Sequence, residues 1–359
     1  MASLSMGGLV LLLAMALPVL AFEGPRATLL RVAAALVGAA QLAMLVAIGG
    51  FSLLHWGLFG LIAAAGQWLS WREKDFEIVP SVSLGLSAIL LAAYPDPELG
   101  EFALVGIAMA LIHGIPLMLR LWQSPPSERV ALELSGLSLA AVAVPMIHFY
   151  RLDQSRDMAF ALLALAASAI PAIGLLLGWT DPARAADRRF GWLTASAGLL
   201  LVVAYAFATP LWALPLGAAL IAAAMLLFGQ RADDGRIEAI ASGFGLASIV
   251  LLGVSSKLPL TEWRRLVGQG GDALDLHALF RWVGLALAAT LFAVKARAAA
   301  TCTGGQVLAA LLGYGAAAQL VAGDWLALVS PLALAGLALW TQRLAWPRLA
   351  PAMGVSAVL

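Results

Sequence analysis

Long apolar segments with almost no charge recur from one end of this chain to the other. Leu4–Phe22 and Val307–Ala322 are two examples. A helix needs about 20 apolar residues to cross the ~30 Å hydrocarbon core of a bilayer. Only 11% of the 359 residues are charged, whereas a soluble domain carries about 25%. The sequence therefore predicts an all-α polytopic transmembrane bundle with the lipid bilayer as its solvent.

The apolar runs predict about thirteen helices joined mostly by short connections, so successive helices are expected to be antiparallel neighbours. One transmembrane domain is expected over residues 1–341, followed by a short cytoplasmic tail at 342–359. No Lys or Arg precedes the first run, which favours a retained helix over a signal peptide. The predicted helices are 4–22, 27–48, 52–71, 78–94, 101–121, 130–149, 158–179, 190–208, 210–228, 238–254, 277–295, 305–322 and 325–341.

The distribution of cations gives an orientation for these helices. Most of the 21 Lys and Arg residues follow odd-numbered helices, as in the loops around Lys74, Arg188 and Arg231. Cytoplasmic loops of membrane proteins carry such an excess of Lys and Arg. We therefore expect a bacterial inner-membrane protein with its N-terminus outside and its C-terminus in the cytoplasm.

Four of the cation-bearing loops follow an aromatic residue at a helix end, namely Trp71, Trp122, Trp179 and Phe228. These residues are spaced by roughly 50 residues, the length of a repeat built from one helical hairpin. Two interpretations stay open. The chain is an internally duplicated array of two-helix hairpins, or any series of hairpins with Trp at the membrane interface gives this spacing.

His113 is the most deeply placed titratable residue, in the middle of a predicted helix. Pro116 follows it and predicts a kink, and a broken helix with a polar side chain is typical of transporter midplane sites. The alternative is a neutral histidine hydrogen-bonded to a neighbouring helix. Gln67 and Gln319 are predicted to make interhelical hydrogen bonds, and small residues such as Gly313 to permit close helix packing.

The predicted outer segment 255–277 contains a short amphipathic stretch, in which Trp263 and Leu266 share one helical face. This pattern predicts a helix lying on the membrane surface. Glu262 falls on another face of the same stretch, together with two arginines.

Two loops on the predicted outer side, 150–157 and 255–277, carry cations, although the orientation pattern places most cations on the other side. These two loops are therefore candidates for a binding site. If the loops meet, they form a charged patch able to hold an anionic head group. The alternative is a pair of solvated loops whose ion pairs contribute little. The candidate substrate-binding residues, with His113, are His148, Arg151, Arg264, Arg265, Asp272 and His277.

Other site classes find no support in the sequence. The four histidines show no metal-ligand spacing, and no phosphate loop or nucleophile elbow occurs, so we expect no metal and no cofactor. A net charge of +1 gives no reason to expect a nucleic-acid partner. The expected partners are the bilayer and an amphiphilic or anionic head-group ligand, and the oligomeric state stays open.

The tight turn Tyr94-Pro-Asp-Pro and the loops that combine Trp with mixed charges resemble those of one known group. This is the uncharacterised family of large bacterial polytopic membrane proteins with twenty or more predicted helices. The resemblance implies that this chain corresponds to a C-terminal portion of such a protein. The resemblance implies no particular activity, because none is established for that family.

Three functions remain in competition. A transporter or permease-like protein is weakly favoured by the number of helices, the possible repeat and the predicted kink beside His113. Few polar residues are available to line a hydrophilic pathway, so an amphiphilic substrate fits such a protein better than a hydrophilic one. The second is a non-catalytic scaffold or assembly factor of the cell envelope. The third is a lipid-linked glycan enzyme with an outer-face site around Arg151, Arg264, Arg265 and Asp272. The absence of catalytic motifs favours a protein that is not an enzyme.

Overall fold

The computed structural model describes residues 27–123, 127–150, 157–181, 187–254, 259–269 and 275–321, with short stretches between 325 and 336. The predicted helix at 4–22, most of the one at 325–341 and the tail at 342–359 lie outside the described residues. Within the described ranges the chain is helical and contains no strand. The predicted all-α architecture is confirmed.

Nine helices among the described residues are long and apolar enough to cross a membrane. They are α2 (Ala27–Ile48), α4 (Ile78–Ala92), α5 (Leu99–Arg120), α6 (Glu128–Phe149), α7 (Met158–Leu177), α8 (Arg188–Ala208), α9 (Leu214–Ala232), α10 (Gly235–Val254) and α12 (Leu276–Lys295). For α4 and α9 the candidate span includes the 3-10 turn that precedes the helix, so the two spans are Lys74–Ala92 and Leu211–Ala232.

Two further helices have the same length but lower mean hydropathy, namely α3 (Leu53–Arg72, 20 residues) and α13 (Ala299–Leu320, 22 residues). The remaining elements are short. They are the eight-residue helix α11 (Pro259–Leu266) and the 3-10 turns η1 (Lys74–Phe76) and η3 (Leu211–Ala213).

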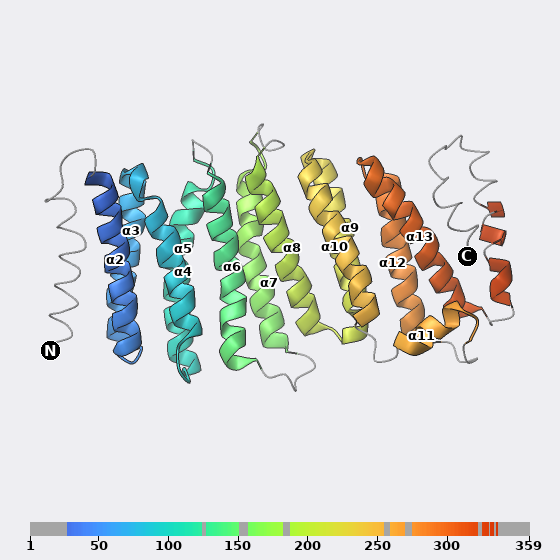
Figure 1. Ribbon diagram of the computed structural model, residues 1–359, viewed down its shortest axis with the longest axis horizontal. Helices are drawn as coiled ribbons and strands as arrows, with labels where there is room; N and C mark the ends of the chain where they lie inside the picture. Colours follow the sequence, from blue (N-terminus) through green and yellow to red (C-terminus); the bar gives the residue numbers. More distant parts are fainter. Residues whose placement is uncertain are drawn as a thin grey trace. The chain divides into compact units, whose positions relative to one another are not determined.

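The helices belong to two compact units, which we describe separately. Unit 1 lies within Met1–Leu152 and Ala169–Gly178, and unit 2 within Asp153–Ser168 and Trp179–Leu359. Helix α7 therefore contributes its first half to unit 2 and its second half to unit 1. Inside each unit, successive long helices alternate in direction (Figure 1).

Unit 1 has a regular packing order. Helix α2 packs on α3 and α4, α3 on α4 and α5, and α4 on α5 and α6. Side chains of successive hairpins therefore meet at a nearly constant sequence separation. Arg120 bonds Ser70, 50 residues away, and Gln123 bonds Trp71, 52 residues away. The period of about 50 residues read from the sequence is thus the period of hairpin packing in unit 1, and it fits both interpretations of its origin.

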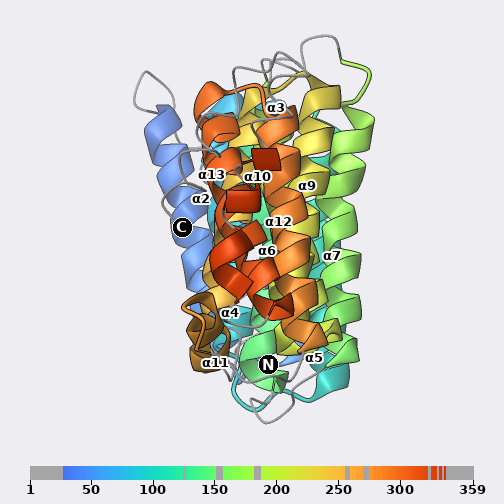
Figure 2. The ribbon, with the colours of Figure 1, turned by 90° about the vertical axis from the view of Figure 1, so that its right-hand side faces the viewer.

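Unit 2 is built on α9 and α12, which pack against each other. Helix α8 and helix α10 pack on α9, whereas α13 packs on α12. Helix α11 lies at one end of the α12–α13 hairpin (Figure 2).

Local chemistry explains where several helices begin. Asp187 accepts a hydrogen bond from the Arg189 amide at the start of α8. Asp275 accepts from the His277 and Ala278 amides at the start of α12. Both are N-caps, in which a carboxylate satisfies amides that have no partner inside the helix.

The helix ends were predicted to within about four residues, and two helix starts differ from the structure by that much or more. Helix α13 begins at Ala299 instead of residue 305, because Gly305 lies so close to the α12 backbone that packing extends the helix through a segment of low apolarity. Helix α9 begins at Leu214 instead of residue 210, because Leu211–Ala213 forms a 3-10 turn. Helix α5 continues without interruption through Pro116.

Candidate functional site

His113 lies at the centre of a hydrogen-bonded contact between three helices of unit 1. Its side chain on α5 is fully buried, at 0% exposure. The Nδ1 atom is 3.2 Å from Gln67 Nε2 on α3, and Nε2 is 3.0 Å from Ser87 Oγ on α4. The predicted interhelical hydrogen bond of Gln67 is confirmed, and its partner is His113.

The donors and acceptors of this contact specify the state of the ring. Ser87 Oγ donates its one proton to the Ser83 carbonyl at 2.8 Å, so it accepts from His113 Nε2–H. The Gln67 amide nitrogen has only protons to offer, so Nδ1 is the acceptor. A neutral imidazole protonated at Nε2 satisfies both bonds. This geometry matches the structural interpretation of His113 as a bridge between helices.

Further polar side chains are linked to the His113 contact, and none of them was predicted from the sequence. Ser70, Ser83 and Ser87 are all at most 4% exposed, and Arg120 Nη1 donates to Ser70 Oγ at 2.9 Å. The spacing of Ser83 and Ser87 was the available signal, because residues four apart on a helix share one face. The core of unit 1 is more polar than the sequence suggested.

His148 stabilises the other end of unit 1. Its Nε2 lies 2.8 Å from the Leu91 carbonyl oxygen and donates to it, and its ring packs edge-on to Phe102. Tyr94 donates to the Glu101 carboxylate at 3.4 Å. Burial and this carboxylate raise the pKa of the Tyr94 phenol above its usual value, which keeps it a donor. Arg151, the predicted neighbour of His148 in a head-group site, lies outside the described residues.

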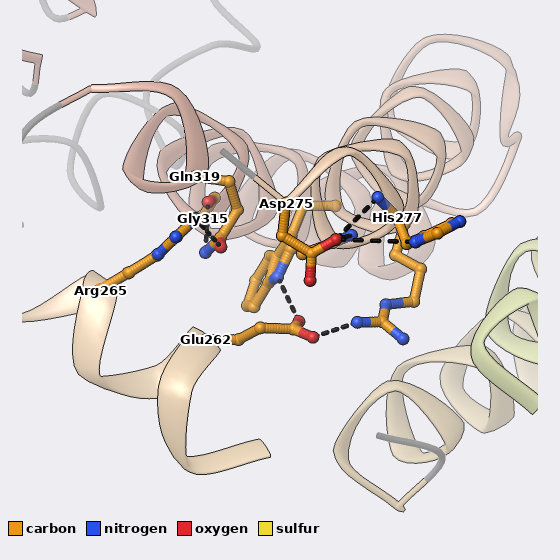
Figure 3. Close-up of polar contacts among 9 residues, drawn as sticks. Glu262, Arg265, Asp275, His277, Gly315 and Gln319 are labelled. Atoms are coloured by element: carbon orange, nitrogen blue, oxygen red, sulfur yellow. Dashed lines mark hydrogen bonds and ion pairs between the residues drawn. The ribbon is translucent and has the colours of Figure 1, made fainter. Parts of the chain in front are cut away.

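The end of unit 2 holds a buried ion pair under α11 (Figure 3). Glu262 and Arg281 form the pair and are 6% and 4% exposed. The second carboxylate oxygen of Glu262 accepts from Trp282 Nε1 at 3.1 Å. We call Glu262, Arg281 and Trp282 the α11 anchor, because they attach α11 to α12.

Two more contacts join α11 to α13. Tyr314 donates its hydroxyl proton to the Leu266 carbonyl at 3.1 Å, and Arg265 Nη1 lies 3.5 Å from Gln319 Oε1. Trp263 lies on the exposed side of α11 and is 50% exposed. Its ring meets the Trp282 ring edge to face, with the two ring centroids 6.0 Å apart. Helix α11 is therefore a packed element of unit 2 with one exposed side.

The predicted outer site is brought together only in part. Arg265 and His277 lie at the same end of unit 2 (Figure 3), and Arg264 is exposed on α11. The His277 ring packs against Trp212 with its centroid 4.4 Å away. Asp272 lies outside the described residues. The charged side chains buried at this end of unit 2 are those of Glu262 and Arg281. Neither residue was among the site residues predicted from the sequence.

A groove runs along unit 2 between α10 and α13, with α9 and α12 as its floor. Its volume is about 270 Å³. The floor includes Ala222, Ala289 and Phe292, which are at most 8% exposed, and Leu246 on the rim is 58% exposed. We call this space the α10–α13 groove. The described residues that line it are apolar or small and none is charged, so the groove suits an apolar chain.

Metal chemistry has no candidate ligand set in the part of the chain that the structure describes, since no three His, Cys, Asp or Glu residues gather there. Comparisons of the chain with protein-family models, with curated proteins and with solved structures gave no match.

Proposed function

We propose that this protein is a permease-like membrane protein for an amphiphilic molecule, whose apolar part occupies the α10–α13 groove. The observation that carries this proposal is the groove itself. It lies among α9, α10 and α12, which have the length and apolarity of membrane-spanning helices. Its volume of about 270 Å³ is close to the lower limit of small-molecule pockets. A single apolar chain matches both its size and its lining.

A bacterial inner membrane, with arginine-rich loops in the cytoplasm, is the proposed location. In this setting the groove is open toward acyl chains, since residues on its rim such as Leu246 are exposed. An amphiphile then reaches the groove from within the bilayer and needs no hydrophilic pathway.

The test is Gly304→Leu, which places a large side chain in the groove. A Cβ on Gly304 meets no atom within 4 Å, so we expect normal folding. Proteoliposomes would be assayed for movement of fluorescent phospholipid, lysophospholipid and fatty acid between leaflets. We expect transport of at least one probe by the wild type and a loss of about tenfold in the variant, because the added side chain takes the volume that the substrate needs.

Gly313→Leu is the matched control on the same helix. Gly313 also has open space around its Cβ position and does not line the groove. Its variant should keep wild-type transport. Movement of none of the three probes by the wild-type protein would contradict the proposed permease function.

An envelope scaffold is the second candidate, and the His113 contact favours it. The imidazole is bonded at both nitrogens and does not line the α10–α13 groove, which is the behaviour of a packing residue. If the protein is a scaffold, its Gly304→Leu variant should restore the phenotype of a deletion strain. If it is a permease that uses the α10–α13 groove, the same variant should fail to do so.

A further inference from the structure

Helix α11 contains one carboxylate, Glu262, and the fold turns it away from the helix's exposed side. Both of its oxygens are used inside unit 2, one by Arg281 and the other by Trp282 Nε1. The guanidinium of Arg281 neutralises the negative charge there. Arg264 is exposed by contrast, and its side chain makes no hydrogen bond or ion pair within the part of the chain that the structure describes. The exposed side of α11 is therefore cationic.

Two large apolar side chains lie beside Arg264 on this exposed side. Trp263 is 50% exposed and Val267 is 69% exposed. The helical turn continues to Val267, since its amide donates to the Arg264 carbonyl at 3.1 Å. Residues four apart share one side of a helical turn, so Trp263 and Val267 are neighbours. We call Trp263, Arg264 and Val267 the α11 surface.

The contacts of α11 place it beside the ends of α12 and α13. Trp282 follows the start of α12 at Leu276 by about 9 Å, at 1.5 Å per residue. Tyr314, which bonds the Leu266 carbonyl, precedes the end of α13 at Leu320 by about the same distance. Helix α12 has the length and apolarity of a membrane-spanning helix. The α11 surface is therefore expected at the level of the lipid head groups and their linkages, where tryptophan is enriched.

The charge of the α11 surface selects among the molecules present at that level. An arginine without a carboxylate partner is attracted to a net negative head group, and its guanidinium donates well to phosphate oxygens. The positive choline group of a zwitterionic lipid weakens this attraction. Exposed tryptophan and valine next to the cation suit the adjoining acyl chains, as in helices that lie in the interface of anionic membranes.

We propose that the α11 surface binds an anionic phospholipid of the surrounding bilayer. Arg264 donates to the phosphate, and Trp263 and Val267 contact the upper part of the acyl chains. The α11 anchor holds this surface in place, because Glu262 attaches α11 to α12. None of the three residues lines the α10–α13 groove. The lipid is therefore retained here whether or not the protein moves an amphiphile.

A fluorescent label at Val267→Cys measures which lipid lies next to α11. The variant is made in a Cys302→Ala background, which removes the natural cysteine. Phosphatidylcholine vesicles containing the full chain receive a nitroxide-labelled quencher lipid, either phosphatidylglycerol or phosphatidylcholine with the same chains. We expect phosphatidylglycerol to give equal quenching at about fivefold lower concentration, the effect of one arginine at an anionic surface. Sodium chloride at about 1 M should reduce this preference.

Substitutions of Arg264 test its role, and a second label position is the matched control. Arg264→Gln should make the two lipids quench equally, whereas Arg264→Lys should retain most of the preference because it keeps the charge. In the control the label is at Leu220→Cys on α9, where the side chain is 67% exposed. Helix α9 begins at the same end of unit 2 as α12, since Trp212 packs against His277. The two lipids should quench this label equally.

Equal quenching of the Val267 label by the two lipids would overturn the proposal. A preference for phosphatidylglycerol that survives in Arg264→Gln, or that is as large for the Leu220 label, would also overturn it. Quenching by neither lipid would mean that a second copy of the chain or another protein covers the α11 surface, against the proposal. Each of these results is independent of transport through the α10–α13 groove and of the Gly304→Leu variant.

Discussion

Glu262 and Arg281 show how a charged residue in this chain is tolerated inside a helical bundle. Each is almost fully buried, and each has the other as its charge partner. Removing one member of a buried pair leaves the other charge buried without a partner. The loss of folding stability is then larger than the net stabilisation that the intact pair provides. The Asp233–Arg297 pair provides a contrast in the same unit, with side chains that are 75% and 50% exposed.

We therefore predict strong coupling between Glu262 and Arg281. Glu262→Gln, which keeps an acceptor for Trp282, and Arg281→Met should each destabilise the protein by about 3 kcal/mol. The double variant should lose clearly less than the sum of the two. Unfolding in mixed detergent micelles measures all four proteins. Asp233→Asn is the control and should cost less than about 1 kcal/mol, and additive effects of the two buried substitutions would refute the coupling.

The bonding of Gln67 was predictable from the sequence, whereas the burial of Glu262 was not, because the two residues differ in the partners available to them. An amide inside an apolar helix needs a partner wherever it lies, so Gln67 was predicted to bond a neighbouring helix. A glutamate in an exposed-looking loop has water as an alternative partner. Its burial depends on Arg281, 19 residues later, and only the packing of α11 on α12 brings the two together.

Glycine positions control how closely α12 and α13 approach. A Cβ on Gly305 would lie 2.6 Å from the Ala293 backbone nitrogen, and one on Gly315 would lie within the ring of Trp282. Small residues let membrane helices approach in this way. Gly313, which the sequence suggested for this role, has open space instead. The composition of α13 predicts close packing, but the rotation of the helix decides which glycine is used.

We predict opposite effects of alanine at two adjacent positions in α13. Gly305→Ala should destabilise the protein by about 1–3 kcal/mol, because backbone atoms of α12 must move. Gly304→Ala should be neutral or stabilising by up to about 1 kcal/mol, because alanine favours the helix and meets no neighbour. Thermal unfolding in detergent compares the two. Equal stability of both variants would mean that α12 and α13 are farther apart than the structure indicates.

For the whole molecule, the charges in the loops between helices predict how the protein is oriented in the membrane. The loops with Lys74, Asp187 and Asp233 follow odd-numbered helices of the predicted order, whereas the Tyr94–Asp96 turn follows an even-numbered one. Cations accumulate in the first set, and the positive-inside trend predicts that this set is cytoplasmic.

Reporter fusions test this orientation directly. Fluorescent-protein fusions at residues 74, 187 and 233 should be fluorescent, and alkaline phosphatase at the same positions should be inactive. Fusions at Asp96 should behave in the opposite way. Export of the segments around 74, 187 and 233 would invert the proposed topology. The α10–α13 groove would remain, but the predicted location of the α11 anchor on the outer side would be wrong.

The helical class, the approximate positions of the helices and the period of the hairpins were all predictable from the amino-acid sequence. Apolar run length and turn residues act locally, so they can be read without knowing which helices touch. The partners of His113, the burial of Glu262 and the α10–α13 groove are visible only in the folded protein. Each of these depends on how helices distant in sequence are rotated and spaced against one another, and no local pattern encodes that.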